Sequence, residues 1–207
     1  MSRWVIGLTG NIATGKSAVM RLAAERGALT IDADRVVHDL LAGDAGIQAQ
    51  VVAAFGEGVR RADGGIDRAA LGAVVFGDPA RLQQLEAILH PAVRLAIARR
   101  VAASDAPVIV IEAIKLLEGP LAETCDQVWV TACRRETQMA RLRVCRGMAE
   151  ADAATRIDAQ SPQADKIARA DVVIVTDGLL RETEAQVAAA WAALESRGAG
   201  GQATARG

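Results

Sequence analysis

The sequence predicts an α/β protein with a five-stranded parallel sheet and helices on both of its faces, a three-layer arrangement. Short apolar runs rich in Val and Ile alternate with longer segments of helical apolar spacing, which is the order expected of parallel strands joined by crossover helices. The 207 residues, 51% of them hydrophobic, suffice for one domain with a full core. We expect that domain to span residues 1–196, and we expect the small, polar tail over residues 197–207 to be disordered.

The five predicted strands are short and mostly apolar. They are residues 4–8, 29–31, 108–111, 127–130 and 171–175. The run Val108-Ile109-Val110-Ile111 is typical of a parallel strand that is buried on both faces. Ligands of such sheets bind at the carboxyl ends of the strands, so the residues that follow each strand are the first candidates for a functional site.

The longest predicted helical region lies between the second and third strands, over residues 35–104. Its glycine-rich breaks fall at residues 43–46, 56–58 and 64–65. Further helices are predicted over residues 17–26, 134–146, 150–158 and 179–194. The helix over residues 134–146 is densely basic, which makes it a candidate for contact with anionic groups.

The segment from Gly10 to Ser17 fits the pattern G-x-x-x-x-G-K-[ST] between the first predicted strand and the first predicted helix. Glycines let the backbone curl so that its N–H groups point at phosphate oxygens, and the next helix adds its positive N-terminal end. Lys16 can reach the β- and γ-phosphates, and the Ser17 hydroxyl can bind Mg²⁺. The sequence therefore predicts a P-loop protein that binds ATP and Mg²⁺. The predicted binding residues are Asn11, Ile12, Ala13, Thr14, Gly15, Lys16 and Ser17.

Other motifs narrow the class of P-loop protein. A GTPase switch protein needs D-x-x-G and N-K-x-D motifs, but no Asp here has Gly three residues later, and Asn11 is the only Asn. The third predicted strand is followed by Glu112 rather than by the Asp of large motor or transporter ATPases. A small-molecule kinase fits the length and the motifs best.

Asp32 and Asp34 follow the second predicted strand and supply the carboxylates that a kinase requires. Alternate residues leaving a strand project to opposite sides, so one carboxylate can face the metal and the other the acceptor. A carboxylate near the acceptor hydroxyl orients it and takes its proton. The alternative for this pair is a turn or a helix cap before Arg35.

With these residues the chain resembles the dephospho-CoA kinase family, small P-loop kinases that use ATP to phosphorylate the ribose 3′-hydroxyl of dephospho-CoA. The resemblance spans about residues 3–195. The stretches that carry it are Ile6–Ser17, Ile31–Asp34, Leu89–Pro91, Leu116–Glu118, Gln160 with Lys166, and Ala170 with Asp171. Other nucleoside, nucleotide or small-alcohol kinases, and a non-catalytic ATP-sensing module, are the alternatives.

The resemblance implies roles for individual residues. Asp34 would be the general base for the 3′-hydroxyl, with Asp32 beside the metal. Residues 134–160 would form a lid that closes over the phosphates, with Arg141, Arg146 or both as phosphate clamps. Residues 35–104 would receive the CoA moiety. His90 and Leu116 would belong to the acceptor site, although a lone His before Pro91 is as often a structural residue.

The chain also departs from the family pattern. Asn11 and Ala13 stand where the family commonly has glycine, so the flexibility of the loop differs. Lys115 replaces the usual Pro of a Pro-Leu-Leu segment. Asp177 replaces the usual Asn after the last strand, which puts an adenine contact from that position in doubt.

Composition limits the partners. The 24 basic and 25 acidic residues give a formal charge of −1, and aromatic residues make up only 2%, so neither nucleic acid nor an anionic membrane is an expected partner. No apolar stretch is long enough to span a bilayer. The cysteines, Cys125, Cys133 and Cys145, show neither zinc spacing nor a disulfide framework. We expect a cytoplasmic protein that is a monomer or a weak homo-oligomer.

Overall fold

The structure, a computed structural model, describes residues 3–203, and the side chains of residues 3–197. The chain divides into two compact units, residues 1–31 with 105–207 and residues 32–104. The second unit nearly coincides with the predicted helical region over residues 35–104. That the two units serve a single kinase reaction stays a prediction.

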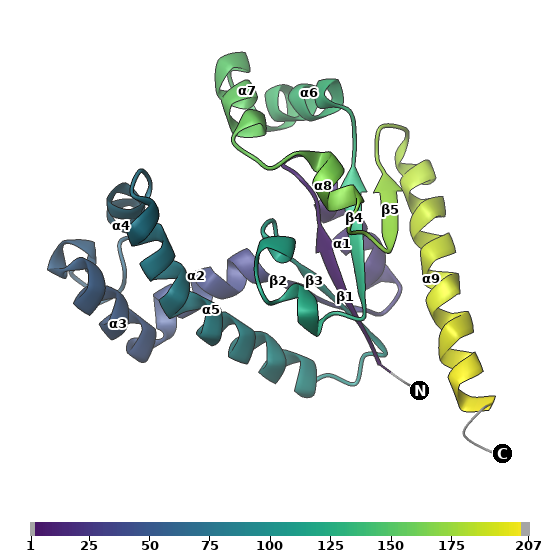
Figure 1. Cartoon of the computed structure of the whole chain (residues 1–207), viewed down its shortest axis with the longest axis horizontal. Coiled ribbons are helices and arrows are strands. Elements are labelled where there is room, and N and C mark those ends of the chain that lie inside the picture. Colours follow the sequence, from purple (N-terminus) through teal and green to yellow (C-terminus); the bar gives the residue numbers. More distant parts are fainter. Residues whose placement is uncertain (1–2, 204–207) are drawn as a thin grey trace. The chain divides into compact units, whose positions relative to one another are not determined.

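A five-stranded sheet forms the centre of the first unit, with the strand order β2-β3-β1-β4-β5 (Figure 1). The strands are β1 Trp4–Thr9, β2 Leu29–Asp32, β3 Val108–Glu112, β4 Gln127–Ala132 and β5 Val172–Val175. β1 pairs in parallel with β3 and β4, and β4 pairs in parallel with β5. The predicted α/β class and five-stranded parallel sheet are confirmed.

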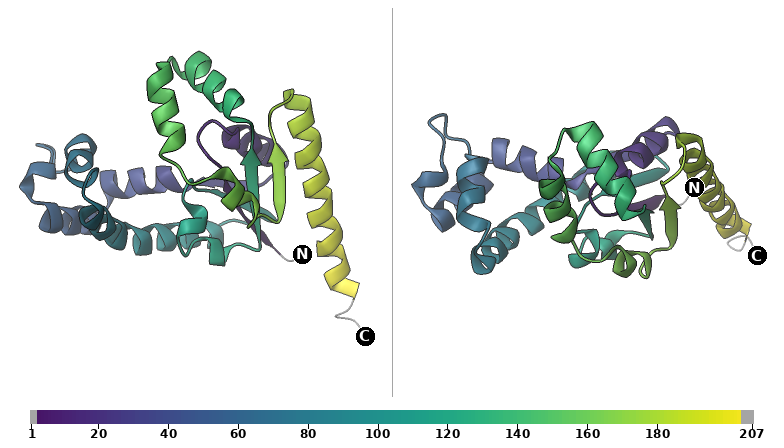
Figure 2. Two further views of the ribbon diagram at one scale, coloured as in Figure 1. Left: turned by 45° about the horizontal axis from the view of Figure 1, so that its top comes forward. Right: turned by 90° about the horizontal axis from the view of Figure 1, so that it is seen from above.

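Helices cover both faces of this sheet because side chains alternate along each strand. Ile6 and Leu8 of β1 are fully buried in a cluster with residues of α1 (Lys16–Glu25) and α9 (Leu180–Ala203). Gly7 faces the other way, where a Cβ would lie 2.6 Å from Leu116 Cδ2 in the 3₁₀ helix η2 (Leu116–Glu118). Figure 2 shows α1 and α9 on one face and α8 (Gln163–Ile167) on the other.

Two helices of the predicted lid follow β4. They are α6 (Arg135–Arg146) and α7 (Glu150–Asp158), so their predicted bounds are correct to within one residue. Leu142 of α6 packs against Ala153 and Ile157 of α7. The short helices α8, η2 and η3 (Ala122–Thr124) were not predicted, because segments of three to five residues show too little periodicity.

The last helix is longer than its sequence pattern indicates. α9 continues to Ala203, whereas the pattern predicts an end near residue 194 and a disordered tail over residues 197–207. No Pro interrupts the chain between Leu180 and Ala203, so each residue there keeps the N–H that a helix needs. Residues 204–207 of the predicted tail lie outside the described residues.

The second unit is helical, as predicted. Its helices are α2 (Ala33–Gly43), α3 (Ala45–Phe55), η1 (Glu57–Val59), α4 (Arg68–Val75) and α5 (Pro79–Ala102). Each α-helix begins after an Asp whose carboxylate accepts backbone N–H groups of the first turn, the usual N-cap arrangement. These caps are Asp32, Asp44, Asp67 and Asp78. A cluster that includes Leu41, Val51, Leu71 and Leu89 forms the core of this unit.

Within residues 3–203 no helix combines the length and the apolar character that crossing a bilayer requires.

Candidate phosphate-binding site

The phosphate loop, residues Gly10 to Ser17, joins the carboxyl end of β1 to the start of α1. Gly10 and Gly15 have φ angles of +149° and +91°, which favour glycine. A Cβ at Gly10 would lie 2.3 Å from Thr131 Oγ1, so only glycine fits there. Ala13, with φ +60°, is the one non-glycine residue with positive φ among residues 3–203. The backbone thus has the curled form that the sequence pattern predicts for binding phosphate.

Lys16 lies inside this loop, with 8% of its surface exposed. Its ammonium donates to the carbonyl oxygens of Gly10 and Asn11 at 2.9 and 3.2 Å. The carboxylate of Glu112, at the end of the neighbouring strand β3, lies 3.9 Å away. Oxygen atoms of the protein therefore surround the Lys16 ammonium within the loop. When a nucleotide binds, phosphate oxygens can replace these contacts. Ser17 is exposed at the first turn of α1, where its hydroxyl is accessible to a metal ion.

Buried threonine hydroxyl groups form hydrogen bonds that hold the loop in place. Thr14 Oγ1 bonds to the Asn11 carbonyl at 2.8 Å and to Thr131 Oγ1 of β4 at 2.7 Å. Thr176, which follows β5, donates its hydroxyl to the Thr14 carbonyl at 2.8 Å. These threonines are at most 3% exposed. Buried and bonded, they fix the loop on the ends of the strands.

The predicted lid, residues 134–160, contacts the tip of the phosphate loop through polar side chains. Gln138 Nε2 of α6 donates to the Ile12 carbonyl at 2.8 Å, and Gln160 Oε1 accepts from the Ile12 N–H at 2.6 Å. Asn11 Nδ2 donates to the Ser161 carbonyl at 3.0 Å. Residues near both ends of the predicted lid, and Ser161 just after it, are thereby bonded to residues 11 and 12 of the loop.

Arg141 of α6 bonds to the same loop from its other side. One guanidinium nitrogen donates to the Ala13 carbonyl and to Thr176 Oγ1, both at 3.0 Å, and the other donates to the Thr176 carbonyl. Arg146 is exposed in the last turn of α6. The two predicted clamp residues therefore have different surroundings, and only Arg141 contacts the loop directly.

Asp177, which stands where the family commonly has Asn, connects two segments of the chain through hydrogen bonds. Its Oδ1 accepts from Thr137 Oγ1 at 2.5 Å and from the Arg134 N–H at 2.9 Å. The hydrogen bond from Thr137, followed by those from Arg134, holds the pKa of the Asp177 carboxyl below its usual value. The carboxylate thus joins the turn after β5 to the first turn of α6.

The remaining predicted residues lie in varied positions. Asp32 caps α2 by accepting from the Arg35 N–H at 3.1 Å, as the alternative interpretation of this residue predicts. Asp34 is exposed in the first turn of α2, and His90 is exposed in α5. Leu116 is only 1% exposed and packs against Gly7. Among the described residues, no three His, Cys, Asp or Glu side chains cluster as metal ligands, so the Ser17 hydroxyl is the metal-binding group that the loop itself offers.

Several residues that shape the site were not among the predicted site residues. Glu112 beside Lys16 could have been found, because it ends the strand next to β1. Lys166, 3% exposed, donates to the Ile114 carbonyl at 3.0 Å, and Arg169 donates to the Leu117 carbonyl at 2.8 Å. These cations hold the segment before and within η2. No local pattern announces such long-range contacts.

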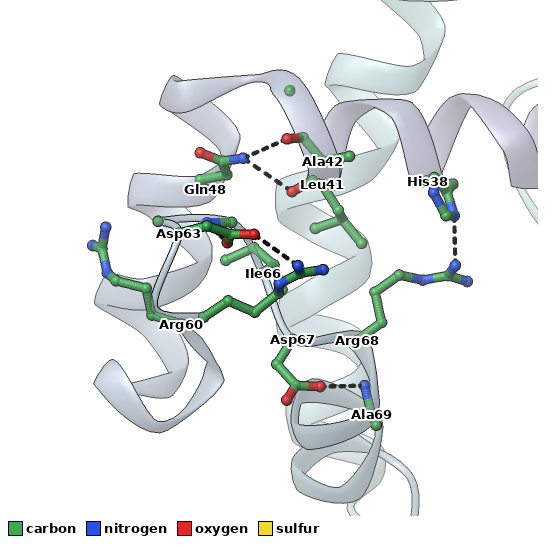
Figure 3. Close-up of a pocket in the computed structure, with 14 residues that line it drawn as sticks. His38, Leu41, Ala42, Gln48, Arg60, Asp63, Ile66, Asp67, Arg68 and Ala69 are labelled. Atoms are coloured by element: carbon green, nitrogen blue, oxygen red, sulfur yellow. Dashed lines mark hydrogen bonds and ion pairs between the residues drawn. The ribbon is translucent and has the colours of Figure 1, made fainter.

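A pocket of about 960 Å³ opens in the second unit (Figure 3). α2 contributes His38, Leu41 and Ala42, and the segment before α4 contributes Arg60 and Arg61, with Arg68 in the first turn of α4. Arg60 pairs with Glu57 at 2.8 Å, and Arg61 pairs with Asp63 at 2.7 Å. Arg68 Nη1 instead lies 2.5 Å from His38 Nδ1.

Comparison with known proteins identifies relatives over most of the chain. A family model described as dephospho-CoA kinase matches residues 4–182. The dephospho-CoA kinase of Symbiobacterium thermophilum is 45% identical over 192 residues, which cover 91% of this chain and 80% of that protein. The dephospho-CoA kinase of Geobacter sulfurreducens is 41% identical, with 91% and 97% covered.

Solved structures agree on the fold. A protein of Thermus thermophilus superposes with a TM-score of 0.81 at 30% identity, covering 94% of this chain and 99% of that one. Dephospho-CoA kinase from Campylobacter jejuni has a TM-score of 0.60 at 22% identity, with 91% and 95% covered. Shikimate kinase from Bacteroides thetaiotaomicron has a TM-score of 0.55 at 15% identity, with 93% and 98% covered. At these lower identities the likeness concerns the P-loop kinase fold alone.

Proposed function

The chain belongs to the dephospho-CoA kinase family, and we propose that it transfers the γ-phosphoryl group of ATP to the ribose 3′-hydroxyl of dephospho-CoA, with Asp34 as the general base. The observation that carries the proposal is the curled phosphate loop with Lys16 bonded to it. The relatives of the chain are named dephospho-CoA kinases, after this acceptor. The alternatives left by the sequence, another small kinase or an ATP-sensing module, have no such support.

The residues of this chain account for the chemical requirements of the transfer. Backbone N–H groups of the loop and the Lys16 ammonium would bind the β- and γ-phosphates and neutralise the charge that develops on the transferred group. Arg141 and Arg146 are the proposed further cations from the lid. Asp34 would orient the 3′-hydroxyl and accept its proton as the new O–P bond forms.

Mg²⁺ fits the donor set of the site. The exposed Ser17 hydroxyl is a hard oxygen ligand of the kind that Mg²⁺ takes from a protein when phosphates and water supply the rest, and Asp32 is proposed as a second ligand. The ion would supply further neutralisation of phosphate charge. Residues 134–160, bonded to the loop through Gln138 and Gln160, are proposed to exclude water from the bound ATP.

Substitution of Asp34 by Asn tests the general base. We expect kcat for dephospho-CoA to fall by about 10²–10⁴-fold, the usual contribution of a positioned base, while the KM for ATP changes little. The measurement is ADP release in a coupled assay. Asp39→Asn is the matched control, because Asp39 is an exposed carboxylate of the same helix that pairs with Arg100 at 3.0 Å. Unchanged turnover in Asp34→Asn would refute the assignment.

The acceptor is tested separately by comparing dephospho-CoA with a panel of nucleoside monophosphates in the same assay. Preferred turnover of a nucleoside monophosphate would contradict the proposed function. ATP binding without any acceptor-dependent ADP release would favour an ATP-sensing module.

We further propose a cytoplasmic location and a monomeric or weakly associated state. The three cysteines of the chain are all free, which fits a reducing compartment. Size-exclusion chromatography with light scattering measures the oligomeric state directly.

A further inference from the structure

Arg68, in the pocket of the second unit, contacts a histidine, whereas the other arginines of the pocket form ion pairs with carboxylates. Arg60 and Arg61 each have a carboxylate partner. Arg68 makes no ion pair with a carboxylate within the described residues 3–197, and its printed contact is the imidazole of His38. No carboxylate of these residues therefore lies within ion-pair distance of its guanidinium, although Asp63 and Asp67 also line the pocket, a cavity of about 960 Å³ (Figure 3).

The contact also determines which donors the pair presents. A guanidinium can only donate hydrogen bonds, so His38 Nδ1 is the acceptor at 2.5 Å and the ring proton lies on Nε2. Arg68 keeps further N–H groups in its planar fork, and His38 keeps one N–H. Both side chains are exposed. Such a fork suits the paired oxygen atoms of a phosphate group.

The position of the pair along α2 relates it to the proposed general base. His38 lies four residues after Asp34 on α2, so the two side chains share a face of the helix. Four residues rise about 6 Å along a helix axis. In a nucleotide, the 3′-hydroxyl and the 5′ substituent lie on opposite sides of the ribose ring, and the distance between them is comparable with this rise.

We propose that Arg68 and His38 bind the diphosphate at the 5′ position of the acceptor, and that this contact selects dephospho-CoA over acceptors that lack the diphosphate. The inference rests on the proposed function, because it takes the 3′-hydroxyl at Asp34 as its starting point. Ala42, which is exposed further along α2 and lines the same pocket, provides an apolar surface for the chain beyond the diphosphate.

The test compares two ligands that share the adenosine group. In Arg68→Gln we expect the KM for dephospho-CoA to rise by about tenfold to hundredfold, the loss typical of a charge-assisted contact to phosphate. The inhibition constant of adenosine, measured as a competitor of dephospho-CoA, should change less than twofold, because adenosine has no diphosphate. Arg68→Lys should show a smaller rise, since Lys keeps the charge but not the fork.

Arg81→Gln is the matched control. Arg81 is an exposed arginine in the first turn of α5, pairs with Asp78 at 3.5 Å and does not line the pocket, so the KM for dephospho-CoA should stay unchanged. Thermal unfolding of each variant checks that it is folded; if Arg68→Gln is not, Arg68→Lys and His38→Ala carry the same comparison. The inference is overturned if the KM for dephospho-CoA is unchanged, or if this KM and the inhibition constant of adenosine rise by the same factor. Failure of the unmodified protein to phosphorylate dephospho-CoA would instead overturn the proposed function.

Discussion

At the level of single residues, the two arginines of the predicted lid show what a sequence pattern leaves open. Arg141 and Arg146 belong to one basic helix and carry the same charge. In the structure Arg141 donates to the Ala13 carbonyl and to Thr176, whereas Arg146 is exposed. Arg141 therefore positions the phosphate loop whatever else it does during transfer. A clamp on the transferred phosphoryl group stays a prediction for both residues.

The cysteines also differ in their surroundings, and this leads to a reactivity prediction. Burial raises the pKa of the Cys125 thiol to about 11 and raises the pKa of Cys133, while Cys145 is exposed on α6. At pH 8 a thiol with a pKa near 11 is ionised in roughly one molecule in a thousand, and only the thiolate is nucleophilic. We expect iodoacetamide to modify Cys145 at least tenfold faster than Cys125.

Peptide mapping at timed intervals measures these rates. Cys145→Ser should remove the fast phase and leave the slow modification of Cys125 and Cys133 as it was. Equal rates at Cys125 and Cys145 would contradict the expectation.

At the scale of elements, hydrogen bonds connect the predicted lid, residues 134–160, to the phosphate loop. Ile12 is bonded at its carbonyl by Gln138 and at its N–H by Gln160. Asp177 adds a connection from the turn after β5 to the start of α6. If residues 134–160 act as the predicted lid, their movement breaks these contacts or moves residue 12 with them.

Removal of either glutamine amide should weaken nucleotide binding. In Gln138→Met and in Gln160→Met, each near the size of the original side chain, one hydrogen bond to Ile12 is lost. A net cost of about 0.5–1.5 kcal/mol per bond corresponds to a rise of roughly twofold to tenfold in the Kd of a non-hydrolysable ATP analogue.

Calorimetric titration measures that Kd. Arg143→Met is the control within α6, because Arg143 is exposed and pairs with Glu150 at 3.1 Å rather than with the loop. If both glutamine variants bind the analogue as tightly as the unmodified protein, the lid contacts do not shape the phosphate site.

At the scale of the whole molecule, the two compact units have their own core clusters. The cluster around the sheet includes Ile6, Val110 and Trp129, and the cluster of the helical unit includes Leu71 and Leu85. Neither of these clusters contains a residue of the other unit. Local stability can therefore differ between the units.

A core substitution in the helical unit tests this independence. Leu71 is 3% exposed. Its replacement by Ala should lower the free energy of unfolding by about 2–5 kcal/mol, because a cavity remains in the core. We expect faster amide hydrogen exchange within residues 32–104 and little change in β1, β3 and β4. Leu95→Ala, at a position that is 52% exposed, should change exchange only slightly. An equal increase across both units would show that they unfold together.

The class of fold, the phosphate loop and the family could all be predicted from the sequence. Each depends on residues close together in the chain: apolar runs that specify strands, and glycines with a lysine that specify a loop between a strand and a helix. The likeness to dephospho-CoA kinases followed from the same short motifs and is confirmed by the family match over residues 4–182.

The contacts through which distant residues support those motifs could not be predicted and are visible only in the folded structure. Glu112 lies beside Lys16, Gln160 bonds to Ile12, and Arg68 bonds to His38, across separations that leave no periodic signal. The structure also shows that Asp32 caps a helix and that Leu116 is buried. The physical reason is that hydrogen bonds and packing between remote segments depend on where the chain folds back, whereas local patterns report only which element a residue joins.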